Sequence, residues 1–126
     1  MNYSPGHQKY PNHKVNQEHV DHAVSVEIDG ETIARSNNVI RVKEDDHPDR
    51  YYFPRRDVKM SSLKPSPPTT ECPFKGQAHY FNLQAGGNTY KDAVWSYEDP
   101  YEEHQGLKDR VAFYDDKIPE IHVRAA

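Results

Sequence analysis

The chain has 126 residues, which is enough for one ordinary domain and too short for two. Its formal net charge is −4, with 16 Lys and Arg against 20 Asp and Glu, so no basic excess attracts a phosphate backbone and we expect no nucleic-acid partner. The single cysteine excludes an intramolecular disulfide and the multi-cysteine zinc patterns, and it fits a reducing compartment.

Membrane and export signals are not visible in the sequence. No apolar run approaches the roughly 20 residues that cross a bilayer. The N-terminal sequence MNYSPGHQKY contains no apolar core of a secretory signal. We therefore expect a soluble, cytoplasmic protein without a membrane partner.

Residues 1–22 are polar and contain almost nothing to bury, so we expect a flexible N-terminal arm. Histidines occur four times in it, but no cysteine and no helical pattern would bring their rings together. A polar tail is therefore the favoured interpretation, and a metal-capturing arm is the alternative. Residues 23–126 are interpreted as one domain.

Alternating apolar residues predict strands in the first half of that domain. Val24, Val26 and Ile28 alternate strictly and precede Asp29-Gly30, the commonest signal of a type I′ hairpin. Further strands are expected at 33–35, 39–42 and 51–54.

The second half contains longer alternating stretches. Residues 64–70 (KPSPPTT) predict a stiff loop within the domain because proline suits neither a helix nor a central strand. Residues 77–83 and 89–97 predict two strands that are joined by a turn at Gly86-Gly87.

One short helix is expected at residues 100–105. Asp99 is a suitable N-cap, Pro100 suits the first helical position, and Gly106 would end the helix. Two last strands are expected at 110–114 and 121–123. Strands at such short spacing indicate a single-domain antiparallel β sandwich or barrel-like fold.

Four sequence blocks together resemble the domain-of-unknown-function 427 family: YYFPRRDV (51–58), TTECPFKGQAHYFNL (69–83), AVWSYEDPYEE (93–103) and VAFYDD (111–116). The resemblance covers about residues 24–123 and implies a mainly β single-domain fold. The family is sometimes labelled nucleotidyltransferase-like, but the usual signature of such enzymes, a Gly-Ser turn followed by paired carboxylates, is not visible. The positions that match the family's motifs are Tyr52, Phe53, Pro54, Cys72, Pro73, Lys75, Gly76, Tyr80, Trp95, Tyr97, Pro100, Ala112, Phe113 and Tyr114.

Cys72 and Lys75 are the catalytic candidates. An ammonium three residues from a thiol favours the thiolate, which is the nucleophilic form, and His79 is a candidate base. The alternative is a buried, inert thiol. Lys75-Gly76 also suits a phosphate contact, although the sequence lacks the Gly-rich run of a P-loop.

An aromatic-lined pocket is the leading interpretation of the remaining candidates. Trp95 and Tyr97 share a face of one strand, where Tyr52 and Tyr80 would join them as walls. Arg55 and Lys75 would hold an anionic group, and a solvated sheet edge is the alternative role of Arg55. The acids around Asp99 are interpreted as helix-stabilising. The spacing of His79, His104 and His122 predicts no metal site, and no cofactor follows from the sequence.

Three functions remain open from the sequence. The first is binding of a small, anionic molecule in the aromatic pocket. The second is an enzyme that uses Cys72 as the nucleophile of a transfer or hydrolysis reaction. The third is a protein-interaction module that uses the N-terminal arm or the acidic and tyrosine-rich surfaces. The sequence does not determine an oligomeric state.

Overall fold

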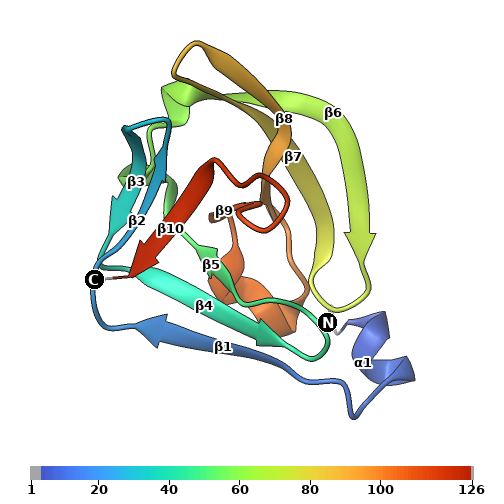
Figure 1. The fold of residues 1–126 in the computed structure, drawn as a ribbon. Helices are drawn as coiled ribbons and strands as arrows, with labels where there is room; N and C mark the ends of the chain where they lie inside the picture. The colour runs from blue at the N-terminus through green and yellow to red at the C-terminus, as the bar shows by residue number, and fades with distance from the viewer. Residues whose placement is uncertain (1–3, 126) are drawn as a thin grey trace.

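A computed structural model describes residues 4–125 of the chain, and it confirms the expected mainly β fold. The strands form three antiparallel sheets with the orders β1-β4-β5, β10-β2-β3 and β6-β7-β8-β9, which curve around a shared interior (Figure 1). The strands are β1 Val15–Val20, β2 Val24–Ile28, β3 Glu31–Ser36, β4 Val39–Glu44, β5 Arg50–Tyr52, β6 Leu63–Cys72, β7 Gly76–Ala85, β8 Asn88–Ser96, β9 Val111–Phe113 and β10 Ile121–Ala125.

The alternating stretch at Val24 forms the expected hairpin. β2 and β3 pair around Asp29 and Gly30, whose backbone φ angles are +50° and +79°. Positive φ at both central residues is what a type I′ turn requires, and Asp and Gly tolerate it better than most residues. The last strand, β10, then adds to the other side of β2.

Two apolar clusters fill the interior. The larger one packs the inward faces of β2 and β3 against β7, β8 and β9, and its fully buried members include Val24, Phe53 and Leu83. The smaller one contains Ile40, Val42, Tyr52, Trp95 and Tyr97, which come from the sheet of β4 and from the sheet of β8. The smaller cluster surrounds the cavity that is described below.

β6 replaces the loop that the sequence predicts at residues 64–70. The Pro-rich stretch pairs with β7 from Leu63↔Leu83 to Cys72↔Gly76, with a register shift between Ser66 and Thr69. β6 has a neighbour on one side only, so a proline that lacks an N–H does not interrupt a central ladder. The prediction of a loop was wrong because the edge position was not visible in the sequence.

The expected helix begins and ends two residues later than the sequence predicts. It is a 3₁₀ element, η3, at Glu102–Leu107, with Tyr101 instead of Asp99 at the N-cap and with Gly106 inside. The Tyr101 N–H donates to the Lys75 carbonyl at 3.0 Å, which ties this stretch to the β6–β7 turn. Two further short 3₁₀ elements are η1 Arg55–Asp57 and η2 Met60–Ser62. Within residues 4–125, no helix has the length and apolar character needed to cross a bilayer.

The described part of the polar N-terminal segment carries more structure than its composition suggests. It contains α1 (Pro5–Lys9) and β1, and β1 pairs with β4 along its whole length. Strand pairing uses backbone groups, so the polar side chains of β1 do not prevent it. The Gly6 N–H donates to the Pro73 carbonyl at 2.7 Å, which places α1 beside the end of the β6–β7 hairpin (Figure 1).

Candidate functional site

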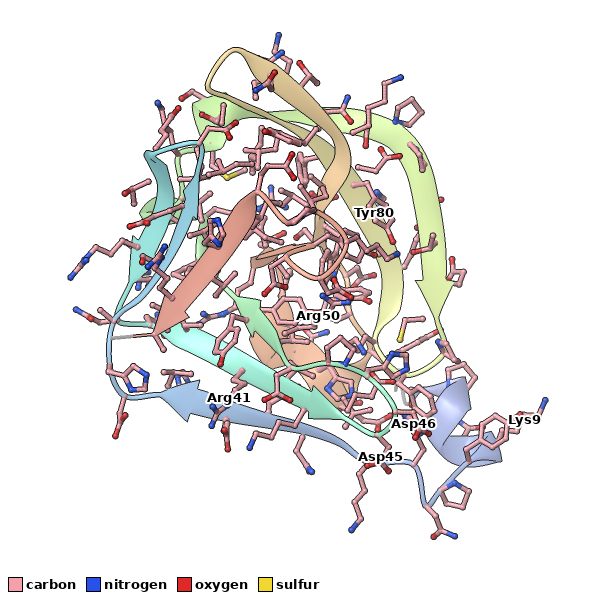
Figure 2. The ribbon with its side chains drawn as sticks, in the orientation of Figure 1. Lys9, Arg41, Asp45, Asp46, Arg50 and Tyr80 are labelled. Carbon is pink, nitrogen blue, oxygen red and sulfur yellow. The ribbon has the colours of Figure 1, made fainter. Side chains whose placement is uncertain are left out.

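A cavity of about 380 Å³ opens between the sheet of β4 and β5 and the sheet of β6, β7 and β8. Arg50 from β5 and Tyr80 from β7 both extend into the interior between these sheets (Figure 2). The lining residues are His13, Val42, Glu44, His47, Pro48, Arg50, Tyr52, Thr70, Glu71, Cys72, Pro73, Phe74, Lys75, Tyr80, Trp95, Tyr97 and Tyr114.

An aromatic wall forms one side of the cavity. Trp95 lies on β8 opposite Tyr80 on β7. The centroid of its ring is 4.2 Å from the ring centroid of Tyr114 and 6.1 Å from that of Tyr52. The ring of Tyr97 lies 6.3 Å from that of Tyr52. These separations are typical of packed aromatic pairs, so the wall is fixed before any ligand arrives.

The Arg50 guanidinium lies against this wall. Its central carbon is 5.1 Å from the centroid of Trp95 and 5.3 Å from that of Tyr114. Asp116 holds the guanidinium with an oxygen at 2.7 Å, and Asp115 approaches it at 3.7 Å. The hydrogen bond with Arg50 is the main cause that lowers the pKa of Asp116. Arg50 is thus a neutralised cation whose flat face covers the aromatic rings.

The phenol hydroxyls around the cavity differ in their partners. The Trp95 indole N–H donates to the Tyr52 hydroxyl at 3.1 Å. The Tyr80 hydroxyl lies 2.9 Å from the Thr70 hydroxyl and 3.2 Å from that of Tyr114. Among the residues that the structure describes, the Tyr97 hydroxyl has no hydrogen-bond partner, although only 6% of this residue is exposed.

The phenols of Tyr52, Tyr97 and Tyr114 remain protonated at neutral pH. Burial is the main cause that raises the pKa of Tyr52, of Tyr97 and of Tyr114 above the ordinary value of 10.0. The neighbouring hydroxyls of Tyr52, Tyr80 and Tyr114 and the Cys72 thiol raise the pKa of Tyr97 further. A protonated phenol donates a hydrogen bond, so the cavity presents donors.

Glu44 and Lys75 form a buried ion pair at the other end of the cavity. The side chains are 9% and 8% exposed, and His13 and His47 contact the same carboxylate at 3.0 and 3.5 Å. Burial raises the pKa of Glu44, but the hydrogen bond and the charge of Lys75, together with His13 and His47, outweigh it, and the net pKa lies below the ordinary value.

The backbone of the β6–β7 turn positions Lys75. Gly76, which follows it, has φ = +122°, and a Cβ there would lie 3.4 Å from the Asp99 carbonyl oxygen. Gly76 therefore accommodates both the unusual backbone angle and the close passage of another segment. His13 stacks on Phe74 of the same turn, with ring centroids 4.3 Å apart, and so covers this end of the cavity.

Most of the residues that the sequence singled out lie around this cavity. The lining includes Tyr52, Cys72, Lys75, Tyr80, Trp95 and Tyr97. Cys72 is a half-buried free thiol at the end of β6.

Arg55 and His79 are the exceptions, because neither lines the cavity, and His79 instead lies 3.9 Å from the Glu98 carboxylate. The Arg55 guanidinium also lies near this carboxylate. It donates to the Asp109 carbonyl at 2.7 Å and to the Ser96 hydroxyl at 3.1 Å, and it pairs with Glu98 at 3.1 Å. Arg55 and Lys75 therefore do not converge on one anion.

The sequence analysis missed several lining residues, most notably Glu44, Arg50 and His13. A signal for Glu44 exists, since Ile40, Val42 and Glu44 alternate and share the inward face of β4. His13 reaches the cavity through the docking of the N-terminal segment, for which the sequence contains no pattern. Within the described residues, no three His, Cys, Asp or Glu side chains converge in a way that could hold a metal ion.

Comparison with known protein families identifies the family of this chain. Residues 16–124 match the family model NTP_transf_9, which is described as a domain of unknown function (DUF427). The search of curated proteins gives no match. The matched range includes β1 except for Val15, and it includes all the strands that line the cavity.

Proposed function

The chain belongs to the DUF427 family, whose description assigns no activity, and from the geometry of the cavity we propose that it binds a small anionic molecule there. The ligand's flat, unsaturated part lies against Trp95, Tyr52 and Tyr80, and its anionic group accepts hydrogen bonds from buried donors. A cavity of about 380 Å³ has the size of a small-molecule site.

The observation that carries this proposal is a set of hydrogen-bond donors that line the cavity and are not all used within the described residues. Among the described residues, the Tyr97 hydroxyl has no partner, and the Tyr52 hydroxyl accepts from Trp95 without donating to another group. The Lys75 ammonium has three N–H donors and uses one of them on Glu44. A ligand rich in acceptors can receive hydrogen bonds from these donors.

The first experiment uses Trp95, the only tryptophan of the chain, as the reporter. Small aromatic carboxylates, beginning with benzoate, are titrated while Trp95 fluorescence is recorded. We expect saturable quenching, and we expect Tyr97→Phe to weaken binding by roughly tenfold, because one hydrogen bond to a charged acceptor is lost.

Tyr90→Phe is the matched control, since the Tyr90 hydroxyl donates to Asp29 at 2.6 Å and Tyr90 does not line the cavity. It should bind the carboxylates like the wild type. Equal affinity of Tyr97→Phe and wild type for the carboxylates would contradict the proposal. So would the absence of binding by every carboxylate tested, when the titrations are repeated by calorimetry.

Lys75→Ala should weaken the same ligand further, because it removes the cation of the site. It also leaves the Glu44 carboxylate buried without its ammonium partner, which destabilises the fold. The double variant Glu44→Gln with Lys75→Met removes both charges at nearly constant volume. If this double variant is folded and still binds as the wild type does, Lys75 is not part of the site.

Cys72 supports a second candidate, an enzyme that uses its thiol in a transfer or hydrolysis reaction. The specific observation is that this thiol lines the cavity and lies close enough to Tyr97 and Tyr52 to affect the pKa of both phenols. A phenol in that position is suited to donate to an oxyanion that develops on a bound carbonyl.

Alkylation of native Cys72 as a function of pH tests this candidate. An activated thiolate reacts fast, with a midpoint well below the free-thiol value of about 8.5. Reaction only after unfolding would identify a structural thiol. It would exclude the enzymatic candidate, and small-molecule binding would remain as the proposed function.

A further inference from the structure

A second polar site lies away from the cavity, in a recess between the β3–β4 turn and η1. The recess has a volume of about 380 Å³ and shares no residue with the cavity. Its lining residues are Arg35, Ser36, Asn37, Asn38, Arg56 and Asp57.

Arg110 packs behind this recess as a cation without a carboxylate partner. Its guanidinium donates to the carbonyls of Asn38 at 2.6 Å and Tyr52 at 3.4 Å, and to the Asn38 side-chain oxygen at 3.2 Å. Among the described residues, all its hydrogen-bond acceptors are neutral. Partial burial, followed by the charge of Arg56, lowers the pKa of Arg110. The positive charges here repel one another and are not neutralised within the protein.

Two exposed arginines face the recess with their guanidinium groups available. Within residues 4–125, neither Arg35 nor Arg56 makes an ion pair. Asp57, the one acid in the lining, accepts the Ser36 hydroxyl at 2.6 Å. Planar guanidinium groups match the oxygens of a phosphate, so these two side chains can bind one from both sides.

The turn itself supplies a third donor that is already oriented. The Ser36 hydroxyl accepts the Asn38 backbone N–H at 2.9 Å, which fixes the turn. The Asn38 side-chain oxygen faces Arg110, so its amide nitrogen must point the other way. That nitrogen makes no hydrogen bond to any residue that the structure describes, and Asn38 lines the recess.

We propose that this recess is a binding site for a phosphate group, either as free phosphate or as a phosphate monoester, which Arg35, Arg56 and the Asn38 amide hold. The proposal is independent of the function assigned to the cavity. Arg110 acts as the positioning residue that orients Asn38, and an anion in the recess relieves the repulsion between Arg110 and Arg56.

Asn38→Asp is the sharpest test because it keeps the size and the oxygen that Arg110 needs. It replaces the amide donor with a second carboxylate oxygen, which repels phosphate. Inorganic phosphate and glucose 6-phosphate are titrated at constant ionic strength against the ¹H–¹⁵N spectrum of the full chain. We expect the amides of residues 36–38 and 56–57 to shift in the wild type, and we expect affinity to fall roughly tenfold or more in Asn38→Asp and in Arg56→Gln.

Arg124→Gln is the matched control, because Arg124 is exposed, pairs with Glu27 at 3.4 Å and does not line the recess. It should bind phosphate as the wild type does. Tighter binding of glucose 6-phosphate than of phosphate would identify the monoester as the ligand class, and the reverse order would identify the free anion.

Three results would overturn the proposal. One is the absence of shifts with both probes, and another is an equal loss of affinity in Arg124→Gln and Arg56→Gln. The third is a set of shifts confined to residues 72–76, which would place the anion in the cavity instead.

Discussion

At the scale of single residues, Glu44 and Lys75 form a buried ion pair that lines one end of the cavity. Removing two charges from water is costly, and their attraction offsets that cost only when other hydrogen bonds complete the environment. His13 and His47 do so for the carboxylate, at 3.0 and 3.5 Å. The ammonium uses one of its three N–H donors on Glu44, and Lys75 lines the cavity.

The lowered pKa of Glu44 predicts a specific pH dependence of stability. Its folded-state pKa lies below the ordinary value of 4.5, so the folded protein binds this proton less readily than the unfolded chain. The stabilisation is therefore fully present above about pH 5 and is lost as the pH falls through the folded-state pKa. In Glu44→Gln, the free energy of unfolding should fall less steeply over this acidic range.

Urea unfolding between pH 7 and pH 3 measures this slope. Glu120→Gln is the control, because Glu120 is exposed and makes no ion pair with any described residue. A slope in Glu44→Gln that equals that of the wild type would show that Lys75 does not stabilise the carboxylate.

Sequence reasoning recovers cavity-lining residues whose type and spacing are distinctive, such as Trp95 on β8 and Tyr97 just after it. It does not recover residues that only the tertiary fold brings in. Arg55 is predicted to bind an anion because it lies in a locally basic stretch with Arg56 and Lys59, yet Glu98 neutralises it. Arg50 is not singled out by the sequence, yet its guanidinium lies against Trp95. Such partners come from distant segments, so no local pattern identifies them.

At the scale of elements, α1 depends on a contact that admits only glycine. A Cβ on Gly6 would lie 2.7 Å from the Phe74 ring and 2.7 Å from the Pro73 carbonyl oxygen. The same turn supplies the Phe74 ring on which His13 stacks. The position of α1 and the closure of one end of the cavity are therefore linked.

Gly6→Ala should detach α1 from the β6–β7 turn without unfolding the sheets. We expect the Gly6 amide to lose its protection from hydrogen exchange, and a protease to cleave within residues 5–13 at least several-fold faster, while the far-UV circular dichroism stays β-type. Gly30→Ala is the control, because a Cβ there meets no atom within 4 Å and its strain stays local to the distant β2–β3 turn. Unchanged protection and cleavage in Gly6→Ala would show that the contact does not hold α1.

The elements that the sequence predicts correctly are those with strict alternation or a strong turn signal. β2, β3, β7 and β8 belong to this group, because burial alternates along β2 and β7 and a Gly-containing turn joins each of them to its partner strand. β1 and β6 do not belong to this group. Backbone hydrogen bonds hold an edge strand in the sheet, so its residues can be polar or can be prolines. The residues of β6 are mostly exposed, which removes the pattern.

At the scale of the whole molecule, the last strand, β10, pairs with an early strand, β2. It pairs with β2 from Ile121↔Ile28 to Ala125↔Val24, and Ile121 is 2% exposed within the larger apolar cluster. The smaller cluster, which contains Trp95, shares strands β7, β8 and β9 with the larger one. The two clusters should therefore unfold together.

Ile121→Ala should lower the free energy of unfolding by about 2–5 kcal/mol through the lost apolar contact and the remaining cavity. Trp95 fluorescence and far-UV circular dichroism should report one coincident transition, although Trp95 lies in the other cluster. His122→Ala, on the exposed face of β10, should change stability by less than about 0.5 kcal/mol. Separate transitions by the two probes would show that the clusters unfold independently.

The prolines of β6 also affect how copies of this protein meet one another. An edge strand of ten residues would ordinarily offer a long row of unpaired N–H and C=O groups to a strand from another molecule. In β6, Pro65, Pro67 and Pro68 lack the N–H, and the register shift after Ser66 interrupts the row that remains. The longest open edge of the fold is thus a poor template for sheet extension between molecules, which protects concentrated solutions of the folded protein from fibre growth along β6.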